Sequence, residues 1–305
     1  MILSLLILPL ALLAWNFLGR RIGERRSMSR LRVDDRGEIA GAAPIRLRGG
    51  ARGTVLMLHG FGDTPQTLVY LANDLHHRGY AVEVPLLPGH GRTLREFARS
   101  GASQWMTAVE DAYAALRVTG ERVSVVGLSM GGALAASLSA RHAEVPALVL
   151  LAPYLRHPPL IRRIARFSGI VGLLAPYLSG GSELSIHDDA ERELSLAYRA
   201  TTPRLLAELG RIADAGRAAL PLLTMPTLLI QSREDNRIAA SVAEEAISSI
   251  GSRRKRLEWL QGCGHVITVD RGRDRVLQLV AEWLDEHTGP ATAARAAGVI
   301  GSGAA

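Results

Sequence analysis

The chain contains one cysteine, Cys263, which excludes an intrachain disulfide and favours a small buried side chain over a redox thiol at that position. Charged residues make up only 21% of the 305 residues and hydrophobic residues 48%, a composition that excludes a disordered chain. The formal charge is +7, and nearly all basic residues are arginine. No helix-turn-helix, zinc or RNA-binding motif accompanies this charge, so we do not expect nucleic-acid binding. The length suits one large α/β domain.

Charge is also absent from the first 18 residues, which form an apolar run. That length is near the lower limit for crossing a bilayer, about 17 residues. Arginines follow the run, whereas a signal peptide carries its positive charge first and ends in a small-residue cleavage site. We therefore expect residues 1–19 to form a membrane anchor, with Trp15 at the interface and the body of the protein cytoplasmic. The alternatives are secretion after signal-peptide cleavage, and a core helix.

The remaining chain divides into a body and two flanking segments. Residues 20–49 are expected to form a linker with a possible edge strand around Ile45, and residues 288–305 a disordered tail without function. Residues 50–287 alternate apolar strands with helical segments, which predicts a doubly wound, mainly parallel sheet with functional groups at the carboxyl ends of its strands. The expected strands are 54–58, 81–85, 123–126, 147–151, 226–231 and 256–260, and the expected helices include 65–78, 106–117 and 274–286.

About seventy residues without a clear strand follow the strand at 147–151. A connection of that length predicts a helical cap, at about 154–220, inserted after this strand. Its arginines, among them Arg162, Arg163 and Arg166, are interpreted as a solvated basic face, with contact to an anionic lipid surface as the alternative.

One short motif lies between a predicted strand and a predicted helix. Gly127-Leu128-Ser129-Met130-Gly131 has the form of a nucleophile elbow, in which a serine occupies a strained strand-to-helix turn. Glycines on either side are needed because a Cβ atom there would crowd the turn.

A serine hydroxyl needs a histidine to take its proton, and that histidine needs an acid to fix its tautomer. Ser129, Asp235 and His265 occur in this order, each after a predicted strand, as in α/β-hydrolases. Glu234 is a rival acid beside Asp235. His59 and His90 also lie in strand-end loops, but they precede the serine, which is the wrong order for the base.

Negative charge that develops on a substrate oxygen requires donors aimed at it. The backbone N–H of Met130, directly after the serine, is one expected donor. The other is expected from the loop after strand 54–58, and we choose the N–H of Phe61, since Gly60 and Gly62 allow close approach of the backbone.

Taken together, six separated motifs within residues 50–287 resemble the bacterial carboxylesterase and monoacylglycerol lipase branch of the α/β-hydrolases. This resemblance implies the α/β-hydrolase fold, hydrolysis of carboxylic esters or monoacylglycerols, no cofactor and no metal, and a cap at 154–220 that covers the acyl pocket. The motifs are His59-Gly60-Phe61-Gly62 with Thr64-Pro65-Gln66, Pro88-Gly89-His90-Gly91, Trp105, Gly127 to Gly132, Ser232-Arg233-Glu234-Asp235 and Gly264-His265 to Asp270.

We therefore expect a serine esterase that forms an acyl-enzyme on Ser129, with His265 as base and Asp235 as the acid that orients it. The alternatives are a thioesterase, peptidase, lysophospholipase or acyltransferase that uses the same triad, because function depends on the pocket. A membrane-tethered binding protein without catalysis is disfavoured, since it would be expected to have lost a member of the triad.

Overall fold

The computed structural model describes the backbone of residues 2–118, 122–180 and 184–288. Its centre is a seven-stranded sheet in the order β1-β3-β2-β4-β5-β8-β9, in which only the β1–β3 pair is antiparallel. The predicted doubly wound, mainly parallel sheet is therefore confirmed. The strands are β1 Ile45–Leu47, β2 Thr54–Leu58, β3 Ala81–Val84, β4 Val123–Leu128, β5 Leu148–Leu151, β8 Thr227–Ser232 and β9 Lys255–Leu260.

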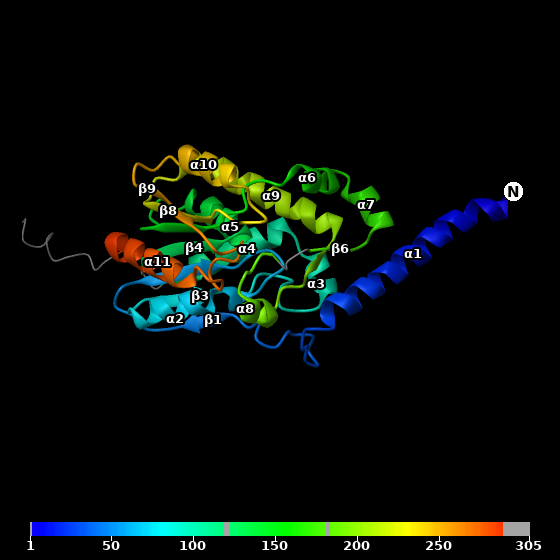
Figure 1. The fold of residues 1–305 in the computed structure, drawn as a ribbon, viewed down its shortest axis with the longest axis horizontal. Coiled ribbons are helices and arrows are strands. Elements are labelled where there is room, and N and C mark those ends of the chain that lie inside the picture. Colours follow the sequence, from blue (N-terminus) through cyan, green and yellow to red (C-terminus); the bar gives the residue numbers. More distant parts are fainter. Residues whose placement is uncertain (1, 119–121, 181–183, 289–305) are drawn as a thin grey trace, which may run out of the picture.

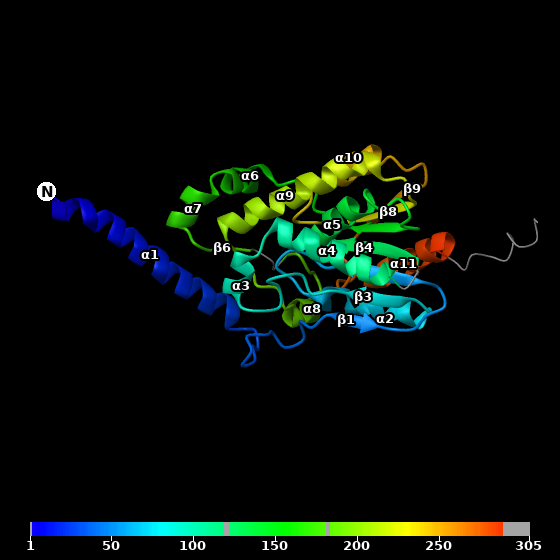
Figure 2. The same ribbon diagram turned by 180° about the vertical axis from the view of Figure 1, so that it is seen from behind.

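Helices cover both faces of this sheet (Figures 1 and 2). Strands β2, β4, β5 and β8 are buried along their whole length, which explains why they are continuous apolar runs and not alternating ones. One hydrophobic cluster lies between the sheet and helices α2 and α11, and a second between the sheet and helices α4, α5, α9 and α10. The bounds are α2 Val69–His77, α4 Ala102–Arg117, α5 Met130–Ser139, α9 Pro203–Ala219, α10 Ala240–Ser249 and α11 Arg273–Thr288.

Two features of the body differ from the sequence expectation. The helix expected at 65–78 begins as a 3-10 turn, Pro65–Leu68, before α2 continues it. A further short helix, α3 Leu94–Arg99, starts at a capping box in which Thr93 and Glu96 each bind the other's backbone N–H.

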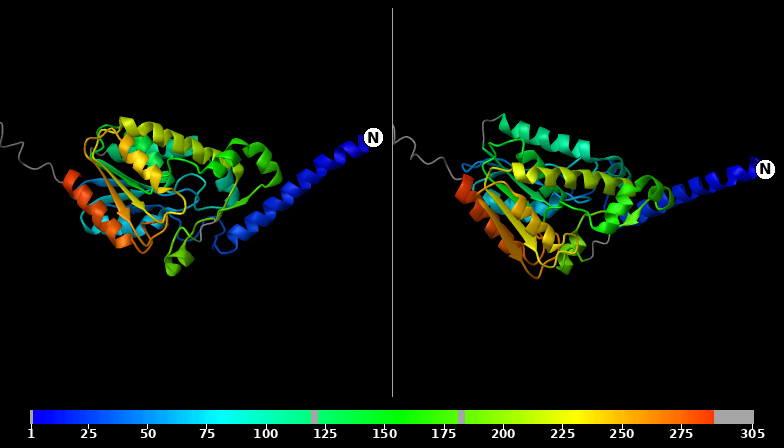
Figure 3. Two further views of the ribbon diagram at one scale, coloured as in Figure 1. Left: turned by 45° about the horizontal axis from the view of Figure 1, so that its top comes forward. Right: turned by 90° about the horizontal axis from the view of Figure 1, so that it is seen from above.

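The segment between β5 and β8 holds most of the helices that flank the carboxyl ends of the strands (Figure 3). It contains α6 Pro159–Arg166, α7 Ser168–Leu174, α8 Asp189–Leu194, α9 and a 3-10 turn, Leu220–Leu222. The short strands β6 Leu178–Ser179 and β7 Ala200–Thr201, which the sequence did not predict, pair antiparallel, with α8 between them in the chain. Helices α6 and α7 bury no side chain, whereas α9 is buried along one face.

The first helix, α1 Ile2–Met28, leans away from the body at the end where α7 lies (Figure 1). It contacts the cap: Trp15 Nε1 donates to the carbonyl of Leu174 at 2.8 Å, and Asn16 Nδ2 to that of Gly172 at 2.8 Å.

The predicted membrane anchor, and the localisation built on it, are wrong. Within the described part of the chain, no helix is both long enough and apolar enough to cross a membrane. From Leu10 onward the apolar stretch of α1 ends at Gly19, because five charged side chains follow between residues 20 and 26. Residues 20–28, expected to belong to a linker, continue the same helix. Of the tail expected at 288–305, Thr288 is the buried last residue of α11, and residues 289–305 lie outside the described residues.

Candidate active site

Ser129 lies at the turn between β4 and α5 with φ 55° and ψ −115°, a conformation that costs free energy for any residue except glycine. The turn is held by hydrogen bonds: the Ser129 N–H donates to the carbonyl of Leu151 at 2.8 Å. A Cβ on Gly127 would lie 2.1 Å from the carbonyl oxygen of Gly131, and one on Gly131 would lie 2.1 Å from that of Leu58. The two glycines are therefore required by the close approach of backbone to backbone.

The structure brings Ser129, His265 and Asp235 together from the loops after β4, β9 and β8. His265 Nε2 lies 2.8 Å from Ser129 Oγ, and His265 Nδ1 lies 2.7 Å from Asp235 Oδ2. Ser129 and His265 are each 8% exposed, and the Asp235 side chain is fully buried. An imidazole that donates from Nδ1 to the carboxylate has its Nε2 free to accept the serine proton.

Several donors hold the Asp235 carboxylate in place. Its Oδ1 accepts the backbone N–H groups of Arg237 and Ile238 at 2.7 and 2.9 Å, and its Oδ2 accepts Gln231 Nε2 at 2.7 Å. Burial favours the neutral acid, but the charge of His265 and these hydrogen bonds outweigh it and lower the pKa of Asp235 below its ordinary value. The group is therefore a carboxylate at neutral pH.

The rival residues have other partners. The Glu234 carboxylate accepts the N–H of Gly262 at 2.7 Å and faces His187 at 3.8 Å. His59 and His90 are buried with their rings 5.0 Å apart, and each accepts a backbone N–H through Nε2, from Leu87 and from Gly62 respectively, at 3.1 Å. Burial lowers the pKa of His59 to about 4, so it remains a neutral acceptor.

The loop that holds Phe61 lies beside the serine. A Cβ on Gly60 would be 3.5 Å from Ser129 Cβ, and Phe61 and Ser129 line one cavity. The Phe61 ring packs against Phe97 and Trp105, with ring centroids 5.1 and 6.0 Å away. Trp105 thus supports this loop.

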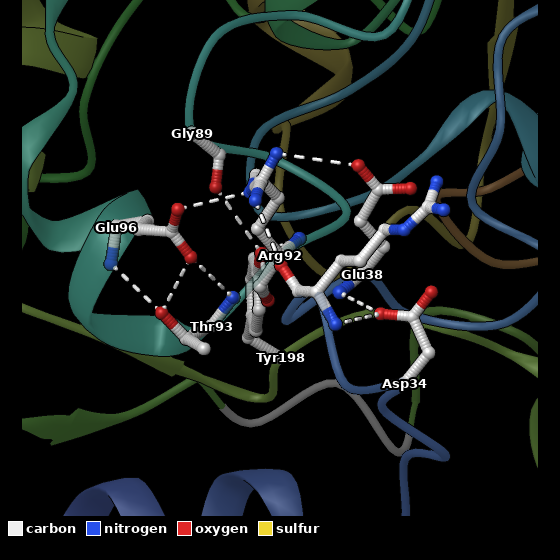
Figure 4. A network of polar contacts seen from close by, with 8 residues as sticks. Asp34, Glu38, Gly89, Arg92, Thr93, Glu96 and Tyr198 are labelled. Atoms are coloured by element: carbon white, nitrogen blue, oxygen red, sulfur yellow. Dashed lines mark hydrogen bonds and ion pairs between the residues drawn. The ribbon is translucent and has the colours of Figure 1, made fainter.

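Tyr198, in the cap, also supports the loop, although no sequence motif indicated it. Its N–H donates to the carbonyl of Gly62 at 3.1 Å, and its own carbonyl accepts the Ser27 hydroxyl of α1 at 2.5 Å. The Tyr198 hydroxyl lies between the backbone of Gly89 and Arg92, in a network that continues through the Arg92 guanidinium and the Thr93–Glu96 capping box (Figure 4). Cap, N-terminal helix and loop are therefore joined at one residue.

Asp270, which the sequence indicated only as the last residue of the motif that begins at Gly264, supports the histidine. Its buried carboxylate accepts four backbone N–H groups, those of Gly264, Arg271, His187 and Asp188, at 2.6 to 2.9 Å. It therefore fixes the turn that precedes His265 and ties that turn to the start of α8.

Comparison with known proteins agrees with this geometry. A sequence model of the family described as serine aminopeptidase, S33, matches residues 49–272, well over half of the chain. The chain belongs to the α/β-hydrolase superfamily.

This α/β-hydrolase is similar to named enzymes over most of its length. It is 31% identical to a thermostable monoacylglycerol lipase of Bacillus sp. (strain H-257), over 82% of this chain and 97% of that one. It is 29% identical to a carboxylesterase of Bacillus subtilis (strain 168), over 80% and 96%. A solved structure described with the metagenome-derived lipolytic enzymes LipS and LipT superposes with a TM-score of 0.75 at 30% identity, over 81% of this chain and 99% of that one.

A cavity of about 340 Å³ in this α/β-hydrolase holds Ser129 and His265 in its wall. Its lining is mainly apolar and includes Phe61 from the body and Ile161, Leu206 and Leu209 from the cap, whose expected range was 154–220. Among the described residues, no cluster of three or more histidine, cysteine or acidic side chains is arranged to hold a metal ion. Cys263 is buried, and burial raises the pKa of its thiol.

Proposed function

We propose that this protein hydrolyses carboxylic esters, as a carboxylesterase or monoacylglycerol lipase does, through an acyl-enzyme on Ser129. The observation that carries the proposal is the unbroken series of hydrogen bonds from Ser129 to His265 to Asp235 in the wall of an apolar cavity. The names of the two Bacillus relatives support the ester bond as the target.

In the first step, Ser129 Oγ attacks the ester carbonyl while its proton passes to His265 Nε2, 2.8 Å away. The imidazolium that forms lies against the Asp235 carboxylate, which stabilises it without taking its proton. His265 then gives the proton to the departing alkoxide, and the alcohol leaves. Water then attacks the acyl-enzyme while His265 takes one of its protons. The bond between the acyl carbon and Ser129 Oγ breaks, His265 returns the proton to Oγ, and the acid leaves.

The tetrahedral intermediates carry a negative oxygen, for which we assign the N–H groups of Phe61 and Met130 as donors. Met130 is the first residue of α5, so its N–H lies at a helix N-terminus, where the dipole favours negative charge. The other donor, the N–H of Phe61, lies in the 60–62 loop, which is hydrogen-bonded through Gly62 to His90 and to Tyr198 of the cap. These bonds keep the Phe61 N–H in place before the charge develops.

The test is the hydrolysis of 4-nitrophenyl esters by a Ser129→Ala variant. We expect kcat to fall on the order of 10⁶-fold, with an unchanged circular dichroism spectrum and melting temperature. Ser139→Ala is the matched control: Ser139 lies in the helix that follows Ser129 and is fully buried, and its hydroxyl has no hydrogen-bond partner among the described residues. Undiminished turnover by Ser129→Ala would refute the assignment.

A panel of substrates separates this proposal from other reactions of the same triad. Monoacylglycerols, lysophospholipids, thioesters and aminoacyl amides of one chain length are compared by kcat/KM, with glycerol added as an acyl acceptor to detect transfer. The proposal requires the simple esters or monoacylglycerols to be cleaved faster than thioesters and amides. Labelling of Ser129 by a fluorophosphonate distinguishes an active serine from a binding protein, in which it would stay unlabelled.

A further inference from the structure

Two arginine side chains line the mainly apolar cavity that holds Ser129 and His265. Arg199 comes from the cap, one residue before β7, and Arg237 from the body, two residues after Asp235. The acidic residue in the cavity wall is Asp63. Burial raises its pKa to about 7, so that near neutral pH much of it is uncharged. The cavity wall therefore holds two guanidinium groups and one partly neutral acid, while the Asp235 carboxylate lies behind His265 and is hydrogen-bonded to it.

The position of Arg199 costs free energy in its backbone conformation and in an unpaired donor. Its backbone has φ 54°, in the left-handed region that non-glycine residues avoid. Its Nε is buried and has no hydrogen-bond partner among the described residues, and none of their carboxylates forms an ion pair with it. Its Nη2 donates to the carbonyl of Arg192 at 2.9 Å.

A second cation lies near Arg199. Burial, and then the charge of Arg199, lower the pKa of Arg30 below its ordinary value. Arg199 is half-buried, and a cation whose buried Nε has no acceptor and which lies near a second cation is costly to hold unless an anion completes the site. The hydrogen bond to Arg192 within the cap uses Nη2 of Arg199 and leaves its Nε as a donor for an anion.

Arg237 is fixed at the same cavity by its surroundings. Its Nε donates to Ser185 Oγ at 3.0 Å and its Nη2 donates to the carbonyl of Gly180. Burial lowers its pKa, while the charge of Asp235 opposes this shift. The side chain is therefore a preorganised charge that needs no rearrangement when a ligand enters.

We infer that the ester substrate carries an oxyanion group, a phosphate or a carboxylate, which Arg199 binds with the support of the Arg237 charge. The planar guanidinium matches the two oxygens of either group, and both are hydrogen-bonded more strongly than a neutral hydroxyl. The hydrocarbon part then packs on Ile161, Leu206 and Leu209. This assignment of a substrate class rests on the proposed esterase function.

The experiment compares pairs of esters that differ only in the anion. The first pair is 1-decanoylglycerol 3-phosphate and 1-decanoylglycerol, with release of decanoate measured. The second pair is mono-4-nitrophenyl suberate and 4-nitrophenyl octanoate. We expect the wild type to show a kcat/KM at least about tenfold higher for the anionic member of one pair, and the pair that shows it identifies phosphate or carboxylate.

Variants of Arg199 test the cause of the preference. Arg199→Gln should bring the ratio of the two kcat/KM values close to one, and Arg199→Lys, which keeps the charge, should retain part of it. Arg163→Gln is the control, since Arg163 is an exposed cap arginine outside the cavity wall, and it should leave the ratio unchanged.

Equal rates for both members of both pairs, or an unchanged ratio in Arg199→Gln, would overturn the inference. Ser129→Ala separates this failure from failure of the proposed function. If Ser129→Ala loses hydrolysis of all four esters and the wild type shows no preference, only the anion site is refuted. If Ser129→Ala retains hydrolysis, the triad itself is refuted.

Discussion

Removing the hydroxyl of Tyr198 tests the attachment of the cap to the body. The hydroxyl accepts the N–H of Arg92 at 3.0 Å and lies 2.8 and 3.2 Å from the carbonyls of Arg92 and Gly89 (Figure 4). Tyr198 is 1% exposed, so no solvent replaces these partners in a Tyr198→Phe variant. The ring still stacks on Phe97, with centroids 4.9 Å apart, and the variant therefore isolates the hydrogen bonds.

The expected loss follows from leaving a shielded donor unpaired, which costs about 1–3 kcal/mol. A central value of about 2 kcal/mol corresponds to a fall in Tm of roughly 4–8 °C for a domain of this size. Thermal unfolding followed by circular dichroism measures it, together with urea unfolding for the free energy.

Tyr113→Phe is the matched control for this prediction. Tyr113 is equally buried, but its hydroxyl donates to Glu144, whose side chain is 46% exposed and finds water instead. We expect a change below about 1 kcal/mol there. A Tyr198→Phe variant no less stable than Tyr113→Phe would show that the hydroxyl does not hold the cap.

Three further predictions concern the support of the site. Gly131→Ala should cost at least about 3 kcal/mol in urea unfolding, because its Cβ would meet a backbone oxygen at 2.1 Å, whereas Gly169→Ala, where a Cβ meets nothing, should be neutral or stabilising. Burial raises the pKa of Asp63 to about 7, so the neutral acid contributes to the free energy of unfolding below about pH 4, and up to about 4 kcal/mol of this contribution is lost as the pH rises through 7. Asp63→Asn should abolish this loss, and parallel curves of stability against pH for wild type and variant between pH 4 and 8 would contradict the prediction. Asp270→Asn places an amide NH₂ against backbone N–H donors beside His265, and we expect kcat to fall about ten- to a hundredfold with little change in KM. The control is Asp274→Asn, at an exposed side chain, which should change neither constant.

The sequence predicted the arrangement of the three polar residues because parallel topology determines it. The carboxyl ends of β4, β8 and β9 lie at one edge of the sheet, so residues that directly follow these strands must meet there. The strands themselves were predictable because burial on both faces demands continuous apolar runs. The order of strands and motifs did not predict which residues hold the triad in place. Asp270, for example, accepts four N–H groups from segments far apart in the chain.

The cap and the N-terminus were less predictable, for different reasons. The β6–β7 pair consists of two-residue strands, too short for any alternation to be visible. In α1 the apolar run indicated a membrane, but the charged residues that follow the run belong to the same helix, and over its described length this helix is not apolar enough to cross one. The contacts of Trp15 and Asn16 with α7 belong to tertiary structure, and no local pattern encodes them.

The close packing of α9 on α5 has a consequence for engineering the enzyme. A Cβ on Gly216 of α9 would lie 2.7 Å from Ala133 Cβ of α5, so the two helices touch nearly backbone to backbone just after the elbow. Any redesign that shifts α9 therefore shifts the serine. Segment 159–174 contributes Ile161 to the cavity without burying a side chain in the core. Because α6 packs on α9, a replacement of this segment has to keep the α6–α9 packing if the position of the serine is to stay unchanged.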